Sequence, residues 1–226
     1  MERGDATRGA ILFHQAHLQC AKCHATSNKT SLLGPNLAKY DEAVKREYLL
    51  ESILEPSLKI REGYQTVVVI TEDGRTLNGI LTADEPDFLV IRDASSDGSE
   101  IRLEKSTLED WTITQQSLMP AGLVNQLGTA EQFYDLARYV IEVAEQGVER
   151  ADELQPPQAL TQLPPLPDYE NDIDHQGMIL ALDDEAFKRG QEIYGRVCAN
   201  CHGTQDRPGS LPTAPRFTTG KLKNGN

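Results

Sequence analysis

Hydrophobic and polar positions follow two different periods along the chain, and the change of period divides its first 146 residues into segments. Helices are predicted over 6–17, where Gly9 and Phe13 share one face, and over 42–54, which Pro56 ends. From 64 to 114 the apolar residues instead form short runs rich in β-branched side chains. We therefore expect an α+β protein with a segment of strands inserted between helices.

The insert at about 64–114 carries the signals of consecutive hairpins. The predicted strands are 64–71, 76–83, 88–93, 100–103 and 111–114. Asp73-Gly74 joins the first two strands and Asp97-Gly98 lies between the next two, and Asp-Gly is a strong signal for a tight turn. So many strands in about fifty residues predict a small antiparallel β-barrel or a strongly curled sheet.

Helical periodicity returns after the insert. Thr129 and Gln132 fit a capping box, in which two side chains satisfy backbone amides at the start of a helix. The apolar residues that follow share one helix face: Phe133, Leu136, Ala137, Val140 and Ala144. We place the first domain at 1–146.

The remainder of the chain divides into a linker and a second domain. Five of the twelve prolines fall between residues 155 and 175 among acidic residues, a composition that predicts an extended linker, placed at 147–182. A helix is expected from about Asp183, and 183–226 is interpreted as the start of a second domain. Gly190 and Tyr194 repeat the spacing of Gly9 and Phe13, so the two ends are related.

Charge and hydropathy exclude some functions. The net charge of −13 argues against nucleic acid, because phosphate binding needs a cationic surface. No apolar run approaches the roughly 18 residues of a membrane helix, so no transmembrane segment is expected. The first residues contain no apolar run, so no secretory signal is expected in this segment.

Two Cys-x-x-Cys-His motifs contain all four cysteines: Cys20, Cys23 and His24 in the first, and Cys198, Cys201 and His202 in the second. This motif is the attachment signature of c-type haem, with the thiols bonded to the porphyrin and the imidazole bound to the iron. Zinc would require a fourth protein ligand, unless the two clusters met in space and shared one metal, and a thioredoxin-like dithiol would not require the histidine. We therefore expect two covalent haems, with His24 and His202 as iron ligands.

The first iron needs a sixth ligand or an open position. Met119 lies on a loop before the last helix of the domain, and a thioether paired with histidine is typical of electron transfer. We expect Met119 to be that ligand; the alternatives are that Met119 fills a gap in the core, or that His14 or His17 takes the position.

The second motif has no methionine or histidine after it in this chain. Met178 and His175 lie upstream and would have to fold back. We expect the natural ligand to lie beyond Asn226 and the chain to be a fragment of a longer protein.

At this point the chain resembles class I cytochrome c. The resemblance rests on Gly9 and Phe13, the first Cys-x-x-Cys-His, Gly34-Pro35-Asn36-Leu37, Met119-Pro120 and Tyr139. It implies a backbone hydrogen bond from His24 to Pro35. Residues 6–145 are more specifically similar to a haem-binding domain family of planctomycete- and verrucomicrobial-type bacteria, through 48–57, Gly63-Tyr64 and Ser117-Leu118-Met119-Pro120. Residues 183–226 resemble the first half of a mono-haem cytochrome c domain, and the insert resembles a small SH3- or Sm-like barrel.

The resemblance implies a periplasmic or exported dihaem cytochrome that carries single electrons between proteins. A dehydrogenase would be the donor and a cytochrome or oxidase the acceptor. The alternatives are a dihaem peroxidase, which is an enzyme, and a haem-based sensor in which the barrel binds a ligand or partner. We expect the insert to fold by itself and its removal to leave the first haem site assembled.

Overall fold

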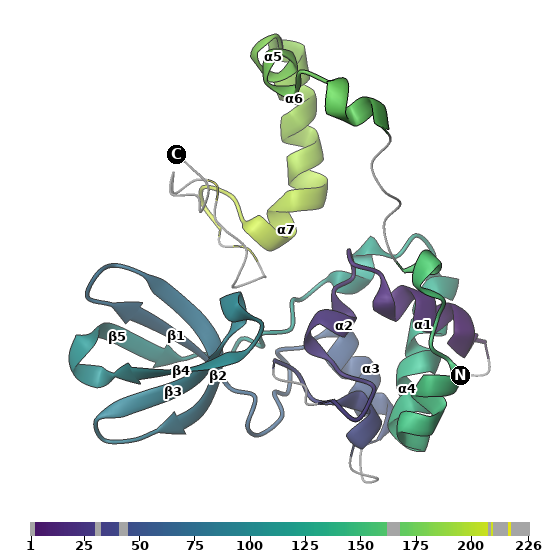
Figure 1. Ribbon diagram of the computed structural model, residues 1–226, viewed down its shortest axis with the longest axis vertical. Coiled ribbons are helices and arrows are strands. Elements are labelled where there is room, and N and C mark those ends of the chain that lie inside the picture. Colours follow the sequence, from purple (N-terminus) through teal and green to yellow (C-terminus); the bar gives the residue numbers. More distant parts are fainter. Residues whose placement is uncertain are drawn as a thin grey trace. The chain divides into compact units, whose positions relative to one another are not determined.

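The computed structural model describes residues 3–29, 33–40, 45–161, 168–207, 209 and 217. The chain forms two compact units, residues 1–162 and 163–226 (Figure 1). The first unit combines helices with one antiparallel sheet, which makes it an α+β structure as predicted.

The helical part of the first unit is built on the crossing of its first and last helices. Its α-helices are α1 (Ala6–His14), α2 (Cys20–Cys23), α3 (Arg46–Leu54) and α4 (Ala130–Glu153). A Cβ atom at Gly9 of α1 would lie 2.0 Å from the carbonyl oxygen of Asp135 in α4, so glycine is required for this close approach. The Phe13 and Tyr139 rings pack 5.2 Å apart at the same crossing. Both aromatics are fully buried, so Gly9, Phe13 and Tyr139 serve helix packing.

Two of the predicted helix boundaries differ from the structure. Helix α1 ends at His14 and not at residue 17, because Gln15 is extended and its N–H bonds back to the carbonyl of Leu12. This early end turns the chain so that Leu18 is buried in the helical core. Helix α3 begins at Arg46, and residues 41–44 lie outside the described part of the chain.

Helix α4 continues beyond the domain boundary predicted at residue 146. Thr129 caps it, accepting a hydrogen bond from the N–H of Gln132 as expected, but the Gln132 side chain accepts from Gly128 and not from Thr129. At Gly147 the backbone takes φ 76° and kinks the helix. The segment after the kink packs Ala151 back into the helical core. The linker prediction was therefore wrong for residues 147–153, because a positive-φ glycine redirects this helix without ending it.

The inserted segment folds into five antiparallel strands in the order β4-β3-β2-β1-β5. They are β1 (Thr66–Thr71), β2 (Thr76–Asp84), β3 (Phe88–Asp93), β4 (Ser99–Glu104) and β5 (Leu108–Ile113). Short 3-10 turns, η2 (Ala94–Ser96) and η3 (Lys105–Thr107), connect β3 to β4 and β4 to β5. Each strand lies within two or three residues of its predicted position.

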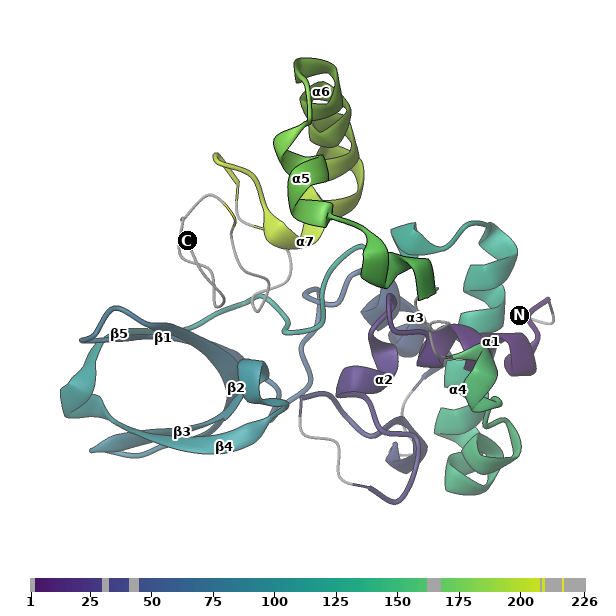
Figure 2. The same ribbon diagram turned by 45° about the horizontal axis from the view of Figure 1, so that its top comes forward.

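The sheet curls around a core of its own but stays open (Figure 2). Within the described residues β4 and β5 are edge strands that share no ladder, so the closed barrel was not the correct expectation. Register shifts at Ile70/Thr71 and at Leu81/Ala83 bend β1 and β2. The curled sheet encloses apolar side chains from its strands: Val67, Val69, Leu89, Ile91 and Leu108, with Leu77, Leu81, Ile101 and Leu103 packed against them.

A buried carboxylate fastens the N-terminus to α4. Asp135 accepts hydrogen bonds from the backbone N–H of Asp5 and from Nε of Arg8, each at 2.7 Å. The hydrogen bond from Arg8 lowers the pKa of Asp135 below its ordinary 3.8, although burial acts in the opposite direction. Folding therefore favours the ionised carboxylate at this position.

This shift predicts a pH dependence of stability. A carboxyl group with a lowered folded-state pKa contributes fully above its ordinary pKa and loses that contribution as the pH falls through the folded value. We expect the free energy of unfolding to be level above about pH 5 and to decline on further acidification. Urea titrations at a series of pH values should give a shallower decline for Asp135→Asn than for the wild type. If the free energy of unfolding declined equally with falling pH in the two proteins, this carboxylate would have no role in the acid dependence of stability.

The second unit is helical where it is described. Its elements include α5 (His175–Leu180), α6 (Asp184–Ile193), a π-helical turn η7 (Tyr194–Cys198) and α7 (Ala199–His202). The predicted cap is present, since the Asp183 carboxylate accepts from the N–H of Ala186. The predicted linker contains α5 and two 3-10 turns, η5 (Gln158–Leu160) and η6 (Asp168–Asp172), while 162–167 lie outside the described residues. No helix in the described parts of the chain is both long and apolar enough to cross a bilayer.

Candidate functional site

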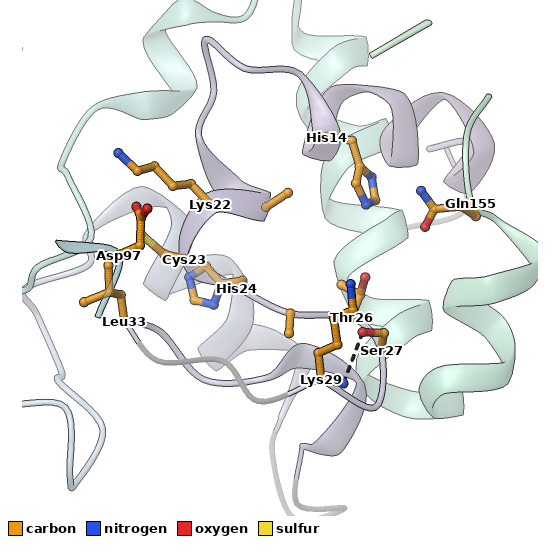
Figure 3. A pocket seen from close by; sticks show the side chains of 12 residues that line it. His14, Lys22, Cys23, His24, Thr26, Ser27, Lys29, Leu33, Asp97 and Gln155 are labelled. Carbon is orange, nitrogen blue, oxygen red and sulfur yellow. Dashed lines mark hydrogen bonds between the residues drawn. The ribbon is translucent and has the colours of Figure 1, made fainter. Parts of the chain in front are cut away.

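A pocket of about 380 Å³ opens beside the first Cys-x-x-Cys-His motif (Figure 3). Its volume falls in the range of cofactor and ligand sites. Cys23 and His24 line it from the motif, and His14 and Thr26 lie on another side of it. Two of the residues to which the sequence assigned the cofactor, Cys23 and His24, thus line one pocket.

The imidazole of His24 is held in one orientation. Its Nδ1 lies 2.9 Å from the carbonyl oxygen of Pro35, the hydrogen bond that the resemblance implied. Because a carbonyl oxygen only accepts, Nδ1 carries the proton and Nε2 keeps its lone pair. Burial lowers the pKa of His24, against the opposing effect of that hydrogen bond, so the ring is neutral at pH 7. A neutral, oriented imidazole with a free Nε2 lone pair is what a metal ligand requires.

The loop of residues 33–37 supports this orientation. A Cβ atom at Gly34 would lie 2.7 Å from Cε1 of His24, so the ring packs directly on the glycine backbone. The side-chain amide of Asn36 donates to the carbonyl oxygens of Ser27 at 2.8 Å and Lys29 at 2.9 Å. Leu37 is buried in the helical core. Each residue of Gly34-Pro35-Asn36-Leu37 therefore contributes to holding His24 or its surrounding loop.

The two cysteines of this motif occupy the single turn of α2. All four cysteines of the chain are described, and each is a thiol outside any disulfide. Burial raises the pKa of Cys20 to about 11 and also raises the pKa of Cys23. Reactive dithiols have lowered thiol pKa values, so this environment does not favour a thioredoxin-like function. Cys23 lines the pocket, whereas Cys20 packs against the helical core and donates to the carbonyl of Leu18 at 3.6 Å.

The β unit, residues 64–114, contributes to the same site. Ala94 in the turn between β3 and β4 belongs to a buried cluster with Leu33 and Leu118, and Cys23 packs against that cluster. Asp97 in the same turn lines the pocket (Figure 3). The β unit is therefore part of the pocket wall, and the assembly of the haem site after its removal stays a prediction. Asp97 was expected only as a turn residue, because an Asp-Gly pair signals a turn and carries no information about what that turn contacts.

Of the proposed sixth ligands, His14 lines the pocket and Met119 does not. Met119 is half-buried on the loop after β5, and its neighbour Leu118 packs in the cluster that contacts Cys23. The structure thus brings the methionine loop to the motif without placing Met119 in the pocket wall. His14 Nδ1 lies 2.9 Å from the carbonyl oxygen of Ala10, and His17 is exposed.

The second motif lies on η7 and α7. Cys198 ends the π-helical turn, and Cys201 and His202 follow on α7. The His202 ring stacks on Phe217 at 4.5 Å between centroids. Tyr194, which repeats the position of Phe13, donates from its hydroxyl to the carbonyl of Gly203 at 2.7 Å.

The remaining candidates for the second iron are in α5. His175 Nε2 lies 3.2 Å from a carboxylate oxygen of Glu170, and Met178 is largely exposed. Residues 210–216 and 218–226, including Pro215, lie outside the described part of the chain. In the structure, His175 is therefore engaged with Glu170 and Met178 faces solvent.

Comparison with known protein families finds no match, and comparison with curated proteins finds no similar sequence. Among the described residues, no three His, Cys, Asp or Glu side chains are grouped so as to hold a metal ion by themselves. A haem iron takes four ligands from its porphyrin, so a haem site does not need three metal-binding side chains. It needs an oriented imidazole for the iron and two neighbouring thiols for covalent attachment. Cys23 and His24, with the Gly34 backbone against the ring and the pocket beside it, fit a covalently bound haem, and Cys20 lies on the same turn of α2 as Cys23.

Proposed function

We propose that the protein is a dihaem c-type cytochrome that carries single electrons between proteins. The observation that carries the proposal is the hydrogen bond between His24 and Pro35 beside a pocket that Cys23 also lines. It is supported by the second Cys-x-x-Cys-His, which uses the two remaining cysteines. The haem supplies an iron that alternates between the ferric and ferrous states by one electron.

The residues of the first unit have distinct tasks in this proposal. Cys20 and Cys23 would hold the cofactor by thioether bonds, so that it could not dissociate from a small domain. His24 would bind the iron through Nε2, while the Pro35 carbonyl keeps its ring oriented and raises its basicity. Met119 is proposed as a second iron ligand, which would require its loop to bring the thioether into the pocket.

The second motif takes the same tasks through Cys198, Cys201 and His202. We propose an exported or periplasmic location, because c-type haem is attached outside the bacterial cytoplasm. The proposed partners are redox proteins, with a dehydrogenase as donor and a cytochrome or oxidase as acceptor. An acidic protein of net charge −13 is suited to partners with neutral or basic docking surfaces.

The test is the number of haems bonded to the chain. We expect mass spectrometry of the denatured protein, produced with c-type maturation machinery, to find two haem additions. Cys20→Ala/Cys23→Ala should retain one addition, and so should Cys198→Ala/Cys201→Ala. A single haem addition, zinc in place of haem, or no covalent haem would contradict the dihaem proposal.

A further inference from the structure

The turn between β3 and β4 is fixed by a buried carboxylate. Asp93 is 4 % exposed and accepts hydrogen bonds from the hydroxyls of Ser95 at 2.5 Å and Ser96 at 2.7 Å. The N–H of Gly98 closes the turn by donating to the carbonyl of Asp93 at 2.8 Å. Asp97 follows η2 in the left-handed region, with φ 52°. The turn therefore has a defined conformation.

This turn packs against the proposed haem motif. Ala94 is buried in one cluster with Leu33 from the His24 loop and Leu118 from the methionine loop, and Cys23 packs against this cluster. Figure 3 shows Asp97 beside Cys23, on the same side of the pocket as Lys22. The β unit thus places a carboxylate at one of the two proposed attachment points.

The charges of the pocket lining are few. Among the described residues that line it, Asp97 is acidic, and Lys22 and Lys29 are basic. The pKa of the Cys23 thiol is raised mainly by burial. Two of the charges in the lining also act on this pKa: the Lys22 ammonium lowers it and the Asp97 carboxylate raises it. Asp97 and Lys22 therefore act in opposite directions on the same sulfur.

Reduction of a haem adds one electron, donated by a redox protein, as ferric iron becomes ferrous. A negative charge near the porphyrin edge opposes that electron and lowers the reduction potential, and a positive charge raises it. Because the Asp97 side chain is exposed, water and salt reduce its effect. We expect a change of threefold to tenfold in the redox equilibrium, where tenfold corresponds to 59 mV for one electron.

We propose that the β unit tunes the reduction potential of the first haem through Asp97, whose carboxylate it holds in the pocket wall beside Cys23. The inference rests on the proposed function and assigns the insert a task within it. Asp97 acts on the cofactor from its turn and ligates nothing.

The experiment is a redox titration of the full chain carrying Cys198→Ala/Cys201→Ala, so that one haem is titrated. Asp97→Asn should raise the midpoint potential, shifting the equilibrium threefold to tenfold toward the ferrous form. Asparagine is well tolerated in the left-handed region, so the turn is expected to survive the substitution. Lys22→Gln should lower the potential. The matched control is Asp110→Asn on β5, an exposed carboxylate of the same sheet outside the pocket lining, which should leave the potential unchanged.

Ionic strength separates a charge effect from a structural one. The difference between Asp97→Asn and its parent should shrink as salt is raised, because screening weakens exposed charges. A salt-independent difference, or no difference at all in a protein that carries its haem, would overturn the inference and leave the proposed function intact. Absence of covalent haem at Cys20 and Cys23, found by mass spectrometry before the titration, would overturn both.

Discussion

Gly9→Ala is expected to lower the free energy of unfolding of the first unit by about 2 kcal/mol or more. Adding a methyl group to a packed core typically costs about 1–3 kcal/mol. The new Cβ would lie 2.0 Å from the carbonyl oxygen and 2.6 Å from the carbonyl carbon of Asp135. These are backbone atoms of α4, so no side-chain rotation relieves the contact and the two helices must separate. The loss outweighs the roughly 1 kcal/mol by which alanine is otherwise favoured over glycine within a helix.

The second unit offers a matched control. Gly190 and Tyr194 repeat the mutual spacing of Gly9 and Phe13, but a Cβ atom at Gly190 meets nothing within 4 Å among the described residues. Gly190→Ala is therefore expected to leave stability unchanged or raise it slightly through helix propensity. Urea unfolding followed by far-UV circular dichroism measures both variants. A Gly9→Ala protein as stable as the wild type would contradict the close crossing of α1 and α4.

Met119→Ala is expected to open the sixth position of the first iron and lower its reduction potential by about 0.1 V or more, since axial ligands span roughly 0.8 V. A thioether stabilises ferrous iron relative to water or hydroxide. The sulfur-to-iron charge-transfer band of the oxidised protein should disappear, and only the first of the two haems should be affected. Stability should also fall, because the bond ties the loop after β5 to the cofactor.

His14→Gln is the control for this assignment. His14 lines the pocket in the structure, so it is the next candidate if Met119 is not the ligand. With Met119 bound, His14→Gln should retain the charge-transfer band. If Met119→Ala leaves the band and both potentials unchanged, Met119 is only a core residue. Loss of axial ligation in His14→Gln would then identify the histidine.

The strands were predictable because the turns between them are formed by residue types that favour tight turns. Gly74, with φ 79°, and the Asp97-Gly98 pair, with φ of 52° and 84°, adopt the conformations for which those residues are suited. The openness of the sheet was not predictable, because no residue type in β4 or β5 marks whether these two strands pair. The kink at Gly147 was missed for a related reason, since a glycine in a helical pattern can end, bend or continue the helix.

The candidate site was predictable as far as it is continuous in sequence. Cys20, Cys23 and His24 follow from their motif, and Pro35 followed from the family resemblance. The contribution of Asp97 to the pocket wall was not predictable, because the packing of Ala94 with Leu33 and Leu118 brings its turn to the motif. Contacts between segments so far apart in sequence arise from tertiary packing, and local patterns of residues in one sequence do not reveal them.

The insertion of the sheet between α3 and the methionine loop also bears on the order in which the chain can fold. Helix α1 is joined to α4 by contacts such as Arg8–Asp135, separated by 127 positions, so their pairing closes a very long loop. The hairpins of the sheet pair neighbouring segments and can form early. Once formed, the sheet brings its two ends together, where the N–H of Ser117 donates to the hydroxyl of Ser57 at 3.0 Å. The folded sheet thereby shortens the effective loop between α1 and α4 and lowers the entropy cost of joining the two helices.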